Sequence, residues 1–211
     1  MQPSASADLA PWLSIWTRPR STIRSIVDSV PDQGIGLLAT ISGVSGALDR
    51  AAWRNLGDKF SLTTILVIAI LGGPIGNIVG IYVRTGLFWW TGKWIGGNAD
   101  ASQVRAAVAW SYLPLCASLI LWIPQLVLFG TESFTNETPR LDESIGLEVA
   151  FIGFSAAKLA LLAWSFVIFF NCLGEVQGFS AWKAVGNYFL ALLLVAVPVG
   201  AILAFVYFLR H

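Results

Sequence analysis

The stretch that decides the fold is SLTTILVIAILGGPIGNIVGIYV, residues 61–83, because it contains no charged side chain. A helix rises about 1.5 Å per residue, so about 20 apolar residues cross the ~30 Å hydrocarbon core of a bilayer. Inside that core every backbone polar group needs a partner within the protein, and a helix supplies it. The stretch therefore predicts a transmembrane helix.

The composition of the whole chain agrees with that prediction. Hydrophobic residues make up 56% of the 211 residues and charged residues only 12%, whereas a soluble domain carries about a quarter charged residues. The mean hydropathy is +0.71. The sequence therefore predicts an integral membrane protein, and its net charge of +1 gives no basic field that would attract nucleic acid.

Four further apolar segments are predicted to span the membrane, at residues 33–48, 106–129, 147–170 and 185–209. Together with residues 61–83 they predict an all-α fold, a polytopic bundle of five transmembrane helices. The region 84–96 is rich in Trp, which collects at membrane–water interfaces. Two interpretations of this region stay open: it extends the second span, or it lies flat in the interface.

Residues 1–32 precede the first span and are interpreted as a separate cytoplasmic arm, with residues 33–211 as the transmembrane domain. The segment PWLSIWTRPRSTIRSIVDSVP, residues 11–31, places apolar side chains among three arginines. That pattern is typical of an amphipathic helix lying in the membrane interface. The alternative is that the arm packs beneath the bundle.

The distribution of Lys and Arg predicts the orientation. With the N-terminus in the cytoplasm, the inner segments hold seven basic residues and the outer segments five. The seven are predicted to face the cytoplasmic lipid headgroups: Arg18, Arg20, Arg24, Arg84, Lys93, Arg105 and Lys183.

A short pattern recurs on this predicted inner side: a Ser followed three places later by a basic residue. It occurs at Ser21, Ser102 and Ser180. A Ser side chain can accept a hydrogen bond from the free N–H groups of a first helical turn. Anionic lipid attracts a nearby Lys or Arg by ~1 kcal/mol. Each copy therefore predicts a helix start held at the headgroups.

Three segments together resemble the bacterial branch of the YIP family, the Ypt/Rab-interacting five-span membrane proteins. They are WTRPRSTIRSIV (16–27), WIGGNADASQVRAAVAWSYLP (94–114) and LGEVQGFSAWKAVGNYFLALLL (173–194). The resemblance implies a cytoplasmic N-terminus and a C-terminus outside, in this case across a bacterial inner (plasma) membrane. Eukaryotic members are linked to Rab GTPases, vesicle budding and organelle shape. Rab binding is not carried over, because the arm here has only about 30 residues.

Lys158 is the sharpest candidate for a functional residue. It lies about ten residues into its span, or ~15 Å deep, and an ionisable residue at that depth points to function. The alternative is a structural lysine that reaches outward to the interface or is simply buried. No carboxylate is expected at a matching depth, since Asp49 falls near the outer edge. Pro74 frees the carbonyl of Ile70, which Lys158 could reach. The candidate intramembrane site therefore comprises Lys158, Gly72, Gly73, Pro74, Asn77 and Pro198.

Small residues at helical spacing predict close helix packing in lipid. They are Gly72, Gly76 and Gly80 in the second span with Gly43 and Gly46 in the first. Packing within the chain is the favoured interpretation, and a homo-oligomer face is the alternative. In the loop before the last span, Glu175 is predicted to form a salt bridge with Lys183 or Arg105.

No residue pattern predicts catalysis. The chain has one His, His211, and two Cys in apolar segments, Cys116 and Cys172, so neither a metal site nor another cofactor is expected. Two functions stay open. One is a non-enzymatic membrane-organising or adaptor protein that contacts lipids and an unknown protein partner. The other is a lipid- or solute-translocating protein with a path near Lys158 and Pro74.

Overall fold

The computed structural model describes residues 10–210, so residues 1–9 of the predicted arm and His211 lie outside the description. Within this range every regular element is helical, which confirms the all-α class. The elements are α1 (Ala10–Ser14), α2 (Pro19–Ser29), α3 (Ile35–Trp53), η1 (Leu56–Asp58), α4 (Leu62–Trp94), α5 (Ala101–Trp110), α6 (Leu113–Phe129), η2 (Gly130–Phe134), α7 (Pro139–Asp142), α8 (Ile145–Gln177) and α9 (Ala181–Arg210).

Four segments among the described residues are long and apolar enough to cross a bilayer: Leu62–Trp94, Ala101–Phe134, Ile145–Gln177 and Ala181–Phe208. They correspond to four of the five predicted spans. The remaining prediction, residues 33–48, falls on α3, a helix of 19 residues that carries the charged pair Asp49–Arg50 near its C-terminal end. The structure therefore supports a helical membrane protein with four candidate spans.

The second span is longer than its apolar stretch. α4 runs without interruption for 33 residues, about 50 Å, so residues 84–94 extend the span and do not form a separate interfacial helix. Ser61 begins this helix, because its side chain accepts a hydrogen bond from the amide of Thr64 at 3.3 Å. The extra length carries Trp89, Trp90 and Trp94 beyond the 30 Å that hydrocarbon requires.

The third predicted span is broken into two helices. α5 ends at Trp110 and α6 begins at Leu113, with Pro114 in its first turn, where a missing N–H costs nothing. Asp100, and not Ser102, caps α5, through a reciprocal capping box with Gln103.

The recurring Ser pattern marks a helix start at all three positions, but the Ser caps the helix at only one of them. Ser180 precedes α9, and its hydroxyl accepts a hydrogen bond from the amide of Lys183 at 3.2 Å. Ser21 lies inside α2 and donates to the carbonyl of Arg18. The predictions that Ser21 and Ser102 cap helices are wrong, because α2 begins at Pro19 and α5 at Ala101, before the Ser in each case.

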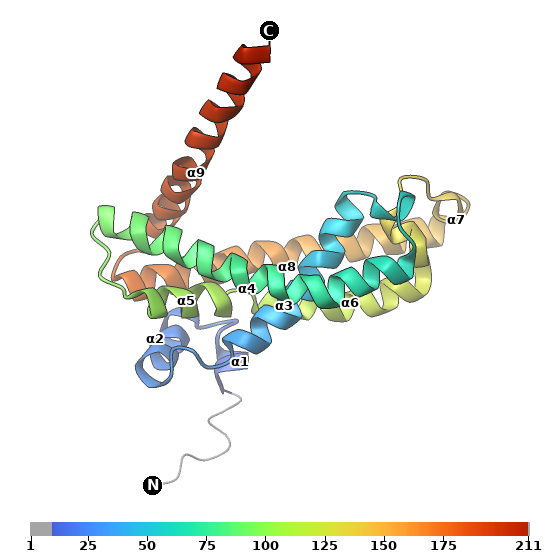
Figure 1. Ribbon diagram of the computed structural model, residues 1–211. Helices are drawn as coiled ribbons and strands as arrows, with labels where there is room; N and C mark the ends of the chain where they lie inside the picture. The colour runs from blue at the N-terminus through green and yellow to red at the C-terminus, as the bar shows by residue number, and fades with distance from the viewer. Residues whose placement is uncertain (1–9, 211) are drawn as a thin grey trace.

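The long helices form an elongated bundle with two different ends (Figure 1). We call the end that carries α1, α2 and α5 the arm end, and the opposite end, with η2 and α7, the loop end. α9 leaves the arm end and rises away from the other helices (Figure 1). Only Ala184, Asn187 and Ala191 of α9 are buried among the residues whose exposure is described. Most of α9 is thus available to lipid or to another protein.

The larger hydrophobic core lies at the arm end and includes the arm itself. Ile15 and Ile23 are fully buried and Ile26 is 2% exposed, with α2 packed on α8 and α5. The apolar side chains of the arm thus pack against the bundle, which agrees with the second of the two interpretations of this segment. A smaller core at the loop end is centred on Trp122 and Phe134.

The closest helix contact joins α3 and α4 through two glycines. A Cβ on Gly73 would stand 2.5 Å from the carbonyl oxygen of Gly43, so neither position has room for a side chain. Gly72 and Gly76, predicted as the packing face, are exposed. The α4 face that packs on α3 is therefore shifted by one residue from the predicted stripe.

Candidate functional site

Lys158 is held in a three-residue cluster built from α3, α6 and α8. Its Nζ lies 3.4 Å from Oδ1 of Asp49 and 3.2 Å from the ring centroid of Trp122. The indole Nε1 of Trp122 donates to the same Oδ1 of Asp49 at 3.1 Å. The ammonium is thereby neutralised by a carboxylate and covered by an aromatic face, two favourable interactions for a desolvated cation.

The expectation that no carboxylate reaches Lys158 is wrong. Counting residues placed Asp49 at the outer edge of a span that ended at residue 48, but α3 continues to Trp53. α3 also packs on α6, which brings Asp49 beside Trp122. Depth along one helix does not predict depth in the bundle, since helices cross at angles.

The other members of the predicted intramembrane site lie elsewhere. Asn77 donates from Nδ2 to the carbonyl of Ala39 at 3.0 Å and to Oγ of Ser42 at 2.9 Å. Pro74 and Gly73 pack beside Gly43 in the same α3–α4 contact. These residues stabilise a helix interface, which is a common role for polar and small residues in membranes.

The remaining predicted members of that site are exposed. Pro198 lies in the part of α9 that projects from the bundle, and Gly72 lies on the open side of α4. The predicted site, in which backbone carbonyls freed by proline surround Lys158, is therefore not found among the described residues. Asp49 already neutralises the charge of Lys158. The cluster therefore serves to hold α3, α6 and α8 together.

Glu175 joins the arm to the bundle. Its carboxylate accepts hydrogen bonds from Nε of Arg20 at 3.0 Å and from Nη2 of Arg24 at 3.1 Å. Arg24 also donates to the backbone carbonyl of Glu175 at 3.0 Å, and Arg20 to that of Phe179 at 3.0 Å. The predicted salt bridge with Lys183 or Arg105 is wrong, because the folded arm brings two arginines closer.

The other predicted headgroup-facing residues lie over aromatic rings, with one exception. Arg84 lies over Tyr112 and Lys183 over Phe179, both at 5.4 Å from the ring centroid. The remaining cases are Lys93 over Trp89 at 6.0 Å and Arg105 over Tyr82 at 5.4 Å, while Arg18 is exposed. Basic and aromatic side chains are thus interleaved at the arm end, as is typical of a membrane interface.

The buried side chain of Gln177 connects α4, α8 and the loop after α4 at the arm end. Gln177 donates from its side-chain Nε2 to the backbone carbonyl of Phe88 at 3.2 Å, and its backbone carbonyl accepts from the backbone amide of Asn98 at 3.2 Å. A Cβ added to Gly92 or Gly97 would overlap the Gln177 side chain. The Gly-Gly loop and the Val-Gln-Gly segment, 80 residues apart in sequence, therefore form one contact.

A second buried amide extends this connection to α9. Asn187 donates to the carbonyl of Phe88 at 3.0 Å and shares a 2.6 Å hydrogen bond with Thr91. The sequence analysis missed Asn187, Asp49 and Trp122. A polar residue inside an apolar helix is the signal that could have identified Asn187, whereas Asp49 looked like the boundary of a span.

These features define a helical integral membrane protein with a folded N-terminal arm. The family model of the Yip1 domain matches residues 13–204, which takes in α2, the Gly-Gly loop and most of α9. The chain belongs to this family. Neither a curated relative nor a solved structure matches the chain.

Proposed function

We propose that this protein organises membranes without catalysis and that the arm end is its working surface. The observation that carries the proposal is the docking of α1 and α2 onto that one end, through Glu175 and a shared core. Because α1, α2 and α5 lie at that end only (Figure 1), the protein occupies more area in one leaflet than in the other. A protein that is wider in one leaflet than in the other favours a curved bilayer, because its wider end displaces more lipid from that leaflet.

Charge supports contact between the arm end and headgroups. Arg18 is exposed on the arm, and Trp182 beside Lys183 is 85% exposed. Juxtamembrane basic residues contribute about 1 kcal/mol each on anionic membranes, and Trp side chains favour the interface. In the predicted orientation, this end meets the cytoplasmic leaflet.

The projecting α9 suits an adaptor role in the same protein. Beyond Ala191 it has a polar or charged side chain only near its end, and its apolar residues other than the half-buried Leu194 are exposed among the described positions. Such a surface is covered by lipid, by another copy or by a protein partner in the bilayer. The arm end would then bind at the membrane surface, while α9 would bind a partner within the bilayer.

Reconstitution tests the proposal. The full chain would be inserted at increasing protein-to-lipid ratios into vesicles containing anionic lipid, and vesicle diameter measured by cryo-electron microscopy. We expect smaller or tubulated vesicles with the wild type. Arg20→Glu with Arg24→Glu should abolish the change, because Glu175 would then repel the arm.

The matched control is Arg54→Glu, which changes an exposed basic residue at the loop end and should leave the vesicle shape effect intact. Unchanged vesicle diameters with wild-type protein at every ratio would refute the proposal. Solute or lipid flux through the same vesicles would favour a translocating protein instead.

A further inference from the structure

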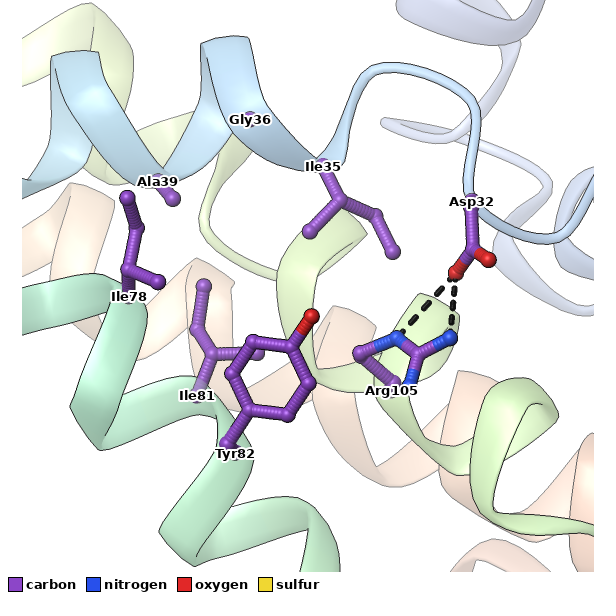
Figure 2. A pocket seen from close by; sticks show the side chains of 8 residues that line it. All are labelled: Asp32, Ile35, Gly36, Ala39, Ile78, Ile81, Tyr82 and Arg105. Atoms are coloured by element: carbon purple, nitrogen blue, oxygen red, sulfur yellow. Dashed lines mark hydrogen bonds and ion pairs between the residues drawn. The ribbon is translucent and has the colours of Figure 1, made fainter.

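A cavity of about 330 Å³ opens between α3 and α4 near the arm end. Figure 2 shows that its wall is apolar on α3 and α4, while Asp32 and Arg105 approach from the loop before α3 and from α5. Gly36 is exposed and Ile78 is 39% exposed. The cavity is therefore open to the outside of the bundle between the two helices.

Its polar rim holds one acid, one base and one phenol. Oδ1 of Asp32 accepts from Nε of Arg105 at 3.1 Å, and also from Nη2. The guanidinium lies 5.4 Å from the ring centroid of Tyr82. The Arg105 side chain is 19% exposed and that of Asp32 62%. The guanidinium is therefore largely enclosed by its neighbours, whereas the carboxylate faces outward.

Three polar groups at this rim have room for a ligand. Within residues 10–210, no hydrogen bond is made by Oδ2 of Asp32, by Nη1 of Arg105 or by the hydroxyl of Tyr82. A guanidinium can donate five hydrogen bonds, a carboxylate accepts on both oxygens, and a phenol does both. The rim thus offers donors on one side and an acceptor on the other, with no net charge.

We propose that this cavity binds the headgroup of a zwitterionic phospholipid that carries a primary ammonium group. The phosphate accepts hydrogen bonds from Arg105 and Tyr82, as guanidinium groups favour. The ammonium donates to the free oxygen of Asp32. The Asp32–Arg105 pair has no net charge but holds a positive and a negative group side by side. It is therefore complementary to a headgroup that carries a phosphate and an ammonium.

The position along the membrane fits a lipid. Counted from Leu62 at 1.5 Å per residue, Tyr82 lies about 30 Å along α4, one hydrocarbon thickness. The rim is therefore at headgroup level, and the wall formed by Ile35, Ile78 and Ile81 descends toward the acyl region. A volume of about 330 Å³ is at the small end of ligand sites, enough for a headgroup with its chains outside.

This inference does not depend on the proposed function, since it concerns the side of α3 and α4 and not the docking of α2. The site discriminates among lipids by two features. Phosphatidylglycerol lacks the ammonium that Asp32 would accept from. Phosphatidylcholine keeps its positive charge but has no N–H to donate.

The test compares lipids with identical dioleoyl chains. The full chain is purified in detergent, delipidated, and mixed with phosphatidylethanolamine, phosphatidylglycerol or phosphatidylcholine, and bound lipid is counted by native mass spectrometry. We expect one phosphatidylethanolamine to be retained about tenfold more strongly than either other lipid, as one charge-assisted hydrogen bond predicts.

Asp32→Asn provides the decisive variant. It removes the negative charge but keeps an oxygen that can accept from Arg105, so the rim becomes cationic. The preference should change from phosphatidylethanolamine to phosphatidylglycerol. The matched control is Asp28→Asn, because Asp28 is exposed at the same end and makes no ion pair within residues 10–210.

Two further measurements keep the proposal falsifiable if Asp32→Asn does not fold. Tyr82→Phe, at a half-exposed ring, should lower phosphatidylethanolamine retention about threefold with unchanged selectivity. Soluble phosphoethanolamine should fail to displace the lipid at millimolar concentration. Equal retention of the three lipids by the wild type, or displacement by the soluble headgroup, would overturn the proposal.

Discussion

Two ion-pair clusters use the same chemistry in different surroundings. Lys158 and Asp49 lie between three helices with Trp122 over the ammonium, and only 16% of the Lys158 side chain is exposed. At the arm end, Glu175 pairs with Arg20 and Arg24, whose side chains are 43% and 44% exposed. The interior cluster should therefore depend on its partners far more than the arm cluster does.

The comparison separates two structural roles. A charge left without its partner inside a bundle keeps its full desolvation cost. The Lys158 cluster therefore stabilises the fold mainly because each charge compensates the burial of the other. Exposed charges lose little when separated, because water and salt screen them. Separating the charges of the arm cluster should therefore cost less than separating those of the interior cluster.

The largest expected effect comes from breaking the interior pair. Lys158→Met leaves Asp49 unpaired and should lower the free energy of unfolding by about 2–3 kcal/mol, below the 3–5 kcal/mol of fully buried pairs because a third of Asp49 is exposed. Unfolding in detergent, followed by circular dichroism during SDS titration, would measure this loss.

The double variant Lys158→Met with Asp49→Asn should recover part of that loss, since neither charge is then alone. Lys59→Met, at an exposed lysine near the loop end, is the control and should have no effect. Simple additivity of the two single substitutions would show that the charges are not coupled.

A second interior substitution tests packing without charge. Gly73→Ala should destabilise the protein by about 1–3 kcal/mol, because its Cβ would stand 2.5 Å from the Gly43 carbonyl oxygen. Gly72→Ala is the matched control, with its nearest atom 3.9 Å away on Ile68, and should be neutral. The same unfolding assay measures both. A greater loss for Gly72→Ala would place the packing face on the predicted stripe after all.

Breaking the arm cluster should have a smaller effect on stability. Glu175→Gln removes both ion pairs and should cost about 1 kcal/mol, with the change confined to the arm. Hydrogen exchange should become faster in α2 but not in α4 or α8. Glu137→Gln, at an exposed loop-end acid, should leave exchange in α2 unchanged.

Salt sharpens the same comparison. In the wild type, raising the salt concentration to 1 M should accelerate exchange in α2, since the Debye length falls to about 3 Å. The Lys158 cluster should respond less, because only 16% of the Lys158 side chain is exposed. Equal salt sensitivity at both places would mean that the interior cluster is open to water.

The smallest expected effect concerns the start of α5. Asp100→Ala removes the capping box and should cost about 0.5–1 kcal/mol, whereas Ser102→Ala should be neutral. Thermal unfolding in detergent would distinguish them if each is compared with the wild type in the same preparation. The reverse order would restore Ser102 as the cap.

The sequence predicted the helices better than it predicted their contacts. Residues 61–83 were recognisable as a span because hydropathy is summed along the chain. Lys158 was recognisable because a charge stands out in an apolar segment. Its partner was not, since Asp49 lies 109 residues away and counting along α3 gave it the wrong depth.

The same distinction applies at the arm end. The Gly-Gly loop and the Val-Gln-Gly segment were recognised as family features, but nothing local indicated that Gln177 fills the space beside Gly92 and Gly97. Likewise the basic residues of the arm were interpreted as lipid anchors, whereas Arg20 and Arg24 bind Glu175. Short spacings identify residue types and leave their partners open.

By itself, the sequence determined that the chain is an all-α membrane protein, since apolar length and composition require helices in lipid, and its family followed from the match over residues 13–204. Only the tertiary structure decided which glycine packs, which acid meets Lys158 and what holds the arm. The physical reason is that hydropathy is a property of each residue in turn. Charge pairing and close packing depend on helices that cross after long separations in sequence.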